Sequence, residues 1–291
     1  MKRIFLLFLL TLFFTSFGLS QIGGRYTYQF VNLTNSARIS SLGGKIVSLP
    51  DNDLNLVYFN PSLLNRNMSN QFVLNYVNYF SDINFGYVSY AKTIENVGNF
   101  SAGLHYINYG TFNETDNTGK ILGNFNAAEY CMNISYSGMI DSLFVIGLSL
   151  KPIYSVLESY QSFGAAVDAG ATYYAKNQLF TAALVVRNAG FQFKPYYPGN
   201  REPLPFEIIA GFTQKLKHAP FRLSLTLHNL QTYKLYFENE NNPSYTVDPV
   251  SGDTTFVKSY VEFLDNAMRH AILGVEFLLT ENFHIRAGYN Y

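Results

Sequence analysis

Residues 221–228 read Phe-Arg-Leu-Ser-Leu-Thr-Leu-His, so apolar residues alternate with polar or charged ones. Because successive side chains of a β-strand point to opposite faces, this alternation predicts a strand with one apolar and one polar face. The same period recurs at 144–151, which reads Phe-Val-Ile-Gly-Leu-Ser-Leu-Lys, and again at 180–187 and 270–277. The sequence therefore predicts an all-β protein built from amphipathic strands.

The alternating segments are also long. Membrane strands are tilted and need about 9–11 residues, whereas strands of soluble proteins have a mode near 5–6. Many segments end in Tyr or Phe, as strands do at the two interfaces of an outer-membrane barrel. A secreted β-sandwich would also alternate, but with shorter strands and more surface charge. We expect strands at 71–80, 83–92, 98–109, 125–137, 143–155, 160–174, 178–188, 205–217, 220–232, 268–279 and 282–291.

The composition is that of a chain that meets lipid. Of 291 residues, 48% are hydrophobic and 17% aromatic, and only 14% are charged, against about 25% in an average soluble protein. Lys and Arg balance Asp and Glu at 20 each, so no basic field exists to bind nucleic acid. No apolar run after residue 20 is long enough for a transmembrane helix. We therefore predict an antiparallel transmembrane outer-membrane β-barrel over 71–291.

The first twenty residues predict a cleavable signal peptide. Lys2 and Arg3 precede an apolar run at 4–14, and the small residues Gly18 and Ser20 stand before the expected cleavage site. An N-terminal membrane anchor is the alternative, but an apolar run of this length is too short to span about 30 Å of hydrocarbon. The chain is thus expected to be exported and to reach the outer membrane.

The connections between the expected strands alternate in length. Short ones include 138–142 and 218–219, and the longer ones are 110–124, 189–204 and 233–267. Outer-membrane barrels have short periplasmic turns and longer outside loops, and bacterial ones have an even strand count. Eleven strands is odd, so we expect the barrel to lack its last strands. The alternatives are a missed strand, or closure by the segment 282–291.

The block 36–64 does not alternate, and it resembles the opening of barrels related to the FadL long-chain fatty-acid transporters. That resemblance implies an inward-folded hatch over residues 21–70, where a plain turn and cap is the alternative. A Leu stands where those barrels usually have Gly after Asn-Pro, so the match is imperfect. The residues that carry the match are Gly43, Gly44, Asp51, Asp53, Asn60 and Pro61.

Over 36–291 the chain looks like the PorQ family, outer-membrane components of the type IX secretion system of the Bacteroidetes. The similar strings include Lys-Pro-Ile-Tyr-Ser at 151–155 and Glu-Pro-Leu-Pro-Phe-Glu at 202–207. The resemblance implies a FadL/PorV-like barrel of 14 strands when complete. It also implies that the barrel holds a surface-exposed PorZ-like protein, with PorU and PorV in the same complex. A FadL-like channel for hydrophobic small molecules is the alternative function.

No sequence motif indicates a catalytic site. The five histidines are dispersed, a Gly-x-Ser-x-Gly motif and a phosphate-binding glycine loop are missing, and Cys131 is expected to be a passive buried thiol. We therefore expect no enzyme, no metal and no cofactor. Charged side chains are instead expected to pair inside the barrel. The candidates are His105, Glu129, Lys151, Asp168, Arg187, Glu207, Lys215, Arg222, His228, Glu276, His284 and Arg286.

The longest connection, 233–267, is the candidate partner-binding loop. It carries six acidic residues against two lysines and is rich in aromatic side chains. Long loops with aromatics of their own usually bind or cover something, so a self-packed hairpin over the barrel mouth is the alternative. Tyr196 and Tyr197 could extend the same surface. The loop residues predicted to contact the partner are Tyr236, Phe237, Tyr245, Phe256 and Tyr260.

Overall fold

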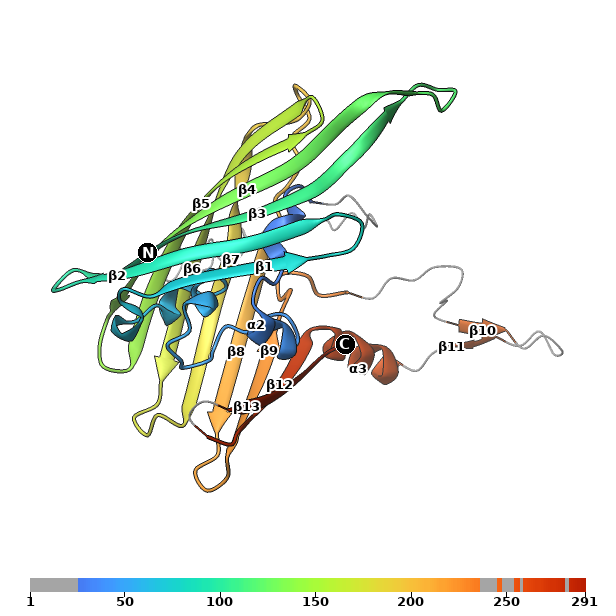
Figure 1. Ribbon diagram of the computed structural model, residues 1–291. Coiled ribbons are helices and arrows are strands. Elements are labelled where there is room, and N and C mark those ends of the chain that lie inside the picture. The colour runs from blue at the N-terminus through green and yellow to red at the C-terminus, as the bar shows by residue number, and fades with distance from the viewer. Residues whose placement is uncertain (1–25, 236–244, 248–253, 257–258, 281–282) are drawn as a thin grey trace, which may run out of the picture.

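A computed structural model describes residues 26–235, 245–247, 254–256, 259–280 and 283–291 (Figure 1). The predicted signal peptide at 1–20 lies outside this part of the chain. Residues 26–70, which we call the N-terminal segment, contain only short helical turns. These are η1 (Gln29–Asn32), α2 (Ala37–Ser41), η2 (Leu54–Tyr58), η3 (Pro61–Leu63) and η4 (Arg66–Met68).

The remainder is almost entirely strand. All eleven predicted segments form strands, and one of them, 160–174, has the predicted bounds. The strands are β1 (Phe72–Asn78), β2 (Asn84–Ile94), β3 (Gly98–Thr115), β4 (Ile121–Met139), β5 (Phe144–Leu157), β6 (Tyr160–Tyr174), β7 (Phe180–Lys194), β8 (Glu207–Lys215), β9 (Phe221–Leu227), β12 (Ala271–Leu278) and β13 (His284–Asn290).

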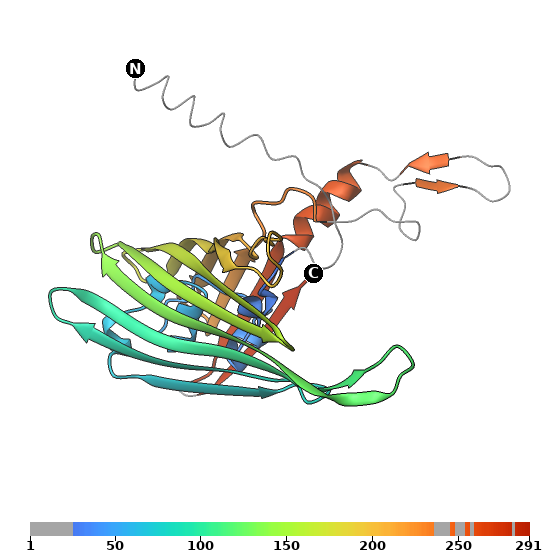
Figure 2. The same cartoon turned by 90° about the horizontal axis from the view of Figure 1, so that it is seen from above.

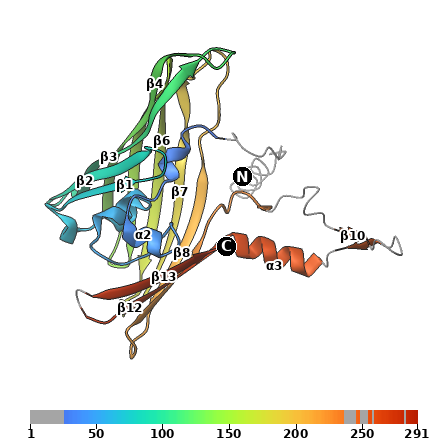
Figure 3. The ribbon, with the colours of Figure 1, turned by 45° about the vertical axis from the view of Figure 1, so that its right-hand side comes forward.

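These eleven strands form one antiparallel sheet in chain order, β1 to β9 followed by β12 and β13. The sheet is strongly curved, and the N-terminal segment lies on its concave side (Figures 2 and 3). Within the described residues, β1 and β13 each pair with one neighbour, so they are the two edges of the sheet. Closure of a barrel and a total of 14 strands therefore stay predictions.

The two faces of the sheet have opposite chemistry. Along β5, Leu150 points outward and its side chain is 47% exposed, whereas Lys151 points to the concave side and is fully buried. The predicted register is confirmed in the same way in β7, β9 and β12, where the face that carries Arg187, Arg222 and Glu276 is buried and the opposite face is more exposed. The sheet is thus apolar outside and polar inside, the reverse of a soluble protein.

The N-terminal segment approaches the sheet closely because glycines line its path. A Cβ atom at Gly147 would overlap the backbone of Pro61, and one at Gly288 would overlap the backbone of Leu42. Both glycines face the concave side, where any side chain would push the segment away. The segment also reaches both edges of the sheet, since α2 lies against β13 and η2 lies against β1.

Some predicted boundaries were wrong. The expected loop 110–124 is mostly strand, because β3 continues to Thr115 and β4 begins at Ile121. Residues 109–126 therefore form a two-stranded ribbon, and β4 pairs with β5 only from Ala127 onward. The expected loop 189–204 also begins as strand, since β7 runs to Lys194. In the ribbon alternation fails because polar residues occupy both faces and no face is buried. At the end of β7 the residues do alternate, with Phe191 and Phe193 exposed and Gln192 buried, so the expected strand simply ended too early.

The expected loop 233–267 contains regular structure as well. It holds the short hairpin β10 (Tyr245–Val247) with β11 (Thr254–Phe256), and the helix α3 (Ser259–Arg269). The strand expected from 268 therefore begins later, at Ala271, because α3 continues to Arg269. None of the described helices is both long and apolar enough to cross a bilayer.

Candidate functional site

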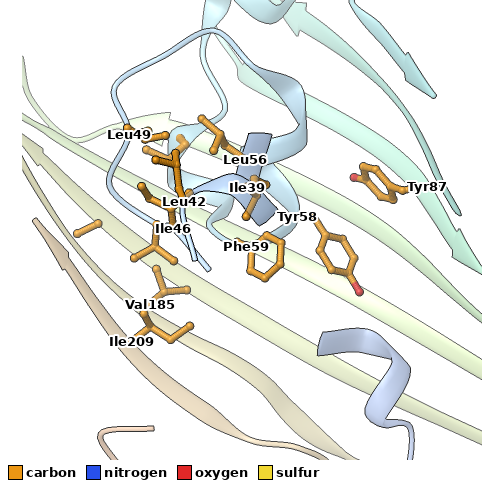
Figure 4. Packing of buried hydrophobic residues seen from close by; sticks show 13 residues of the cluster. Ile39, Leu42, Ile46, Leu49, Leu56, Tyr58, Phe59, Tyr87, Val185 and Ile209 are labelled. Atoms are coloured by element: carbon orange, nitrogen blue, oxygen red, sulfur yellow. The ribbon is translucent and has the colours of Figure 1, made fainter. Parts of the chain in front are cut away.

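The concave side of the sheet is a packed interior in which the N-terminal segment supplies the apolar core. Ile39, Leu42 and Leu56 come from the segment, while Val185 and Ile209 come from β7 and β8 (Figure 4). Each of these side chains is almost fully buried. Because the sheet presents mostly polar side chains inward, the segment brings most of the apolar surface that fills the interior.

Two aromatic residues of η2 and its end connect this core to the charges of the sheet. The hydroxyl of Tyr58 donates to the carbonyl of Val31 at 2.9 Å and lies 3.0 Å from Nδ1 of His105. The guanidinium of Arg187 lies 4.5 Å from the ring centre of the neighbouring Phe59. A cation above an aromatic face is stabilised by the ring quadrupole, so the segment helps to hold a buried charge.

The middle of the sheet carries a buried ion pair between Lys151 of β5 and Asp168 of β6, both fully buried. Asn188 of β7 completes the group: its backbone N–H donates to Oδ1 of Asp168 at 2.8 Å, and its Oδ1 accepts from Nζ of Lys151 at 3.3 Å. Asn188 adopts φ 55°, at a register shift between β6 and β7. This irregularity turns a backbone N–H toward the carboxylate.

A second ionic network joins the N-terminal segment to β9 and β12. Arg222 donates to both carboxylate oxygens of Asp51 at 2.8 and 2.9 Å, and its Nε donates to Glu276 at 2.6 Å. Arg38 of α2 contacts the same two acids, and Arg286 of β13 donates to Glu276 at 2.7 Å. Burial alone would raise the pKa of Asp51, but Arg222 and Arg38 hold it well below its usual range.

A third network lies toward the loop side of the interior. Lys45 of the N-terminal segment donates to Oε1 of Glu207 at 2.5 Å, and Arg187 lies 3.6 Å from the other carboxylate oxygen. Burial lowers the pKa of Lys45, and the attraction of Glu207 opposes that effect. In all three networks a buried charge meets its counter-charge, which is the condition for tolerating it in a low-dielectric interior.

The structure gives local roles to the residues of the predicted hatch motif. Gly43 and Gly44 have φ 93° and 91° and end α2, because their N–H groups donate back to Ser40 and Ile39. Left-handed backbone of this kind is the ordinary place for glycine after a helix. Asp53 caps η2 through a 3.0 Å hydrogen bond from the N–H of Asn55.

Asn60 and Pro61 begin η3, and Asn60 also ties the segment to the sheet. Its side-chain oxygen accepts the N–H of Ser62 at 3.0 Å, while its amide donates to Val47 and to Thr172 of β6. The predicted motif residues therefore gather in the packed interior, although whether the segment acts as a hatch stays a proposal.

Most of the predicted inward-facing ionisable residues lie where expected. Cys131 is a free, fully buried thiol on the same face as Glu129. Lys215 is the exception, since its side chain is exposed at the end of β8. The basic partners Arg38 and Lys45 were missed. A charged residue within an otherwise apolar, glycine-containing block was the only signal for them.

The candidate partner-binding residues fall partly outside the described structure. Tyr236 and Phe237 lie outside it, Tyr245 and Phe256 are paired along the backbone of the β10–β11 hairpin, and Tyr260 belongs to α3. For these residues only the backbone is described.

Tyr196 and Tyr197 were both expected to extend the partner-binding surface, and for Tyr196 this expectation is wrong. Tyr196 turns inward, and its hydroxyl donates to Ser155 at 2.6 Å, whereas Tyr197 is exposed. Within the described residues, no three acidic, His or Cys side chains are grouped to hold a metal ion.

Comparison with solved structures finds proteins of similar fold. The crystal structure of the toluene transporter TbuX of Ralstonia pickettii superposes with a TM-score of 0.51, covering 89% of this chain and 87% of that one at 10% sequence identity. No protein-family model matches, and no curated protein matches. The two chains therefore share a fold, while membership of the PorQ family gains no support.

Proposed function

We propose that this chain is an outer-membrane β-barrel protein that admits hydrophobic small molecules. The observation that carries the proposal is the fold shared with a toluene transporter over 89% of the chain. The outward-facing apolar side chains agree with it, because a sheet with this exterior is stable only against lipid. An aromatic hydrocarbon or a long acyl chain is the substrate class that follows from the comparison and from the sequence resemblance.

Passage would require the N-terminal segment to shift, because it fills the concave side of the sheet. The contact between Ser48 of the segment and Thr213 of β8 offers a way to test this, since their hydroxyl oxygens lie 2.8 Å apart. We therefore propose to replace both residues with Cys in a Cys131→Ser background. A disulfide at this place would fix the segment to the sheet.

The measurement is uptake of radiolabelled toluene and of a long-chain fatty acid by cells that lack a transporter of their own. The wild-type chain should give saturable uptake, the oxidised double-Cys variant should lose it, and reduction should restore it. The matched control joins two neighbouring strands instead, because the hydroxyls of Ser135 and Ser149 also lie 2.7 Å apart. That cross-link should leave uptake intact. Absence of saturable uptake by the wild-type chain contradicts the function.

A second candidate function is favoured by the charge pairing of the interior. The networks that hold Asp51 and Lys45 fix the N-terminal segment at two places, which suits a permanently filled barrel. We propose as the alternative that the chain holds a PorZ-like surface protein of a type IX secretion complex, together with PorU and PorV. The outer segment 233–267 would then be the binding element, and no catalysis is involved in either role.

The alternative predicts a different experiment. Replacing residues 238–256 with a short Gly/Ser linker should release the surface partner from cells while the barrel keeps its heat-modifiable migration on gels. Under this alternative neither the wild-type chain nor the linker variant should give saturable hydrocarbon uptake. A partner that stays attached to cells carrying the linker contradicts the partner-holding role and leaves the segment as a lid.

A further inference from the structure

The helix α3 exposes its apolar face and turns its polar face to the protein. Asn266 is buried, its Oδ1 accepts the N–H of Leu235 at 2.8 Å, and its amide donates to the carbonyl of Tyr233 at 2.6 Å. Phe263 and Leu264, in contrast, are 61% and 57% exposed. A helix on the surface of a soluble protein has the reverse arrangement, so the exposed face of α3 needs an apolar medium.

Two further polar residues of α3, Asp265 and Arg269, are paired within the protein. Asp265 accepts from Arg269 at 2.8 Å and from the hydroxyl of Tyr291 at 2.7 Å. The guanidinium of Arg269 also lies 5.5 Å from the ring centre of Tyr291. These contacts hold the helix to the end of β13 in one rotational setting, with Phe263, Leu264 and Met268 turned away from the protein.

The two strands next to α3 also expose apolar side chains. Leu273 of β12 and Tyr289 of β13 face outward and are 46% and 58% exposed, and Tyr291 follows them at the loop-side end. Figure 3 shows α3 extending sideways from the start of β12, away from the sheet. A helix at this place has the same surroundings as the ends of β12 and β13 beside it.

We propose that α3 lies in the lipid–water interface on the loop side of the membrane, with Phe263, Leu264 and Met268 inserted among the lipids. Amphipathic helices bind in this way, with the apolar face at the boundary between headgroups and acyl chains. The inference rests on the proposed membrane location of the sheet. In this arrangement α3 contacts lipid, and contacts with a protein partner would fall to β10 and β11.

The sequence offers a direct probe, because the chain contains no Trp. Leu264→Trp places the only Trp of the protein on the exposed face of α3, where the larger side chain has room. The variant is inserted into phosphatidylcholine vesicles that contain lipids brominated either near the headgroups or near the chain ends. Bromine quenches Trp on contact, so we expect headgroup-proximal bromine to remove most of the emission.

Two control variants separate this inference from the proposed membrane location. Leu150→Trp, on the outward face in the middle of β5, should be quenched by bromine near the chain ends. Phe112→Trp, on the ribbon beyond the partner strands of the sheet, should be quenched by neither lipid. If Leu150→Trp is not quenched, the membrane location itself fails, and the inference fails with it.

If Leu150→Trp is quenched and Leu264→Trp is not, only the placement of α3 is overturned. A red-shifted emission of Leu264→Trp would then show that α3 lies in water. A blue-shifted emission would show that protein covers the helix. A blue shift that disappears on dilution of the protein would identify a second copy as the cover.

Discussion

Leu150 and Lys151 are neighbours in β5, yet they belong to opposite regions of the molecule. Leu150 lies on the outward face of the sheet, where apolar side chains are exposed, and Lys151 lies in the interior, paired with Asp168. On the outward face any apolar residue of suitable size fulfils the need, because lipid makes no specific contacts. In the interior each charge needs a particular partner. The outward face is therefore defined by a pattern and the interior by individual pairs.

The largest expected effect comes from separating the interior pair. Lys151→Met leaves Asp168 buried without its counter-charge and should lower the free energy of unfolding by about 3–5 kcal/mol. Urea unfolding of the protein in lipid vesicles measures this change. The double variant Lys151→Met/Asp168→Leu should recover most of the loss, since it removes both charges. A stable single variant would show that the interior is not as dry as the buried pair implies.

The outward face should respond strongly to charge as well. Leu150→Arg places a guanidinium near the middle of a membrane strand and should cost about 2–4 kcal/mol at the bilayer midplane. Phe112→Arg is the matched control, because Phe112 lies on the two-stranded ribbon, where β3 and β4 pair only with each other. Refolding yield and urea midpoints in vesicles compare the two. Equal losses would show that the outward face does not meet hydrocarbon.

The contact between the N-terminal segment and the sheet predicts a dependence on pH. The pKa of Asp51 is held low in the folded protein, so its stabilisation is present above the unfolded value of about 4 and is lost as the pH falls below it. Asp51→Asn should cost about 1.5–3 kcal/mol at pH 7, as for hydrogen bonds to charged groups. The difference from wild type should narrow in acid. A difference that stays constant with pH would mean that Asp51 acts only through its shape.

The smallest effect is expected for an ion pair at the surface. Arg66 and Glu95 lie 2.9 Å apart, but both side chains are more than three-quarters exposed. Exposed pairs contribute less than about 1 kcal/mol, so Arg66→Ala should shift the urea midpoint very little. If Arg66→Ala lowers the free energy of unfolding as much as Lys151→Met does, buried and exposed ion pairs do not differ in their contribution to stability.

The difference between the two regions also explains what the sequence could predict. Alternation located all eleven strands and the inward position of Lys151, Arg187 and Arg222, because period two is a local property of a chain. The partner of each charge is not local. Arg222 pairs with Asp51, which lies 171 residues earlier, and no spacing in the sequence signals that contact.

The extension of β3 and β4 into the expected loop 110–124, and the helix α3, were missed for other reasons. In the ribbon at 109–126 no face is buried, so hydrophobicity has no period to follow. In α3 the apolar residues recur with a helical period, but the helix stands within a long aromatic segment that was interpreted as a binding loop. The motif residues Gly43 and Asn60 were identified from resemblance, and their contacts became visible only once the sheet was in place around them.

The distance along the chain between Arg38 and Glu276, 238 residues, sets an order of events for assembly. The N-terminal segment is the earliest described part of the chain, while β9 and β12, which anchor it, come much later in the sequence. In any delivery from the N-terminus onward, the segment must wait without its ionic partners in the sheet until those strands arrive. Because contacts between distant residues slow folding, we expect the anchoring of this segment to be among the last and slowest steps in the maturation of the protein.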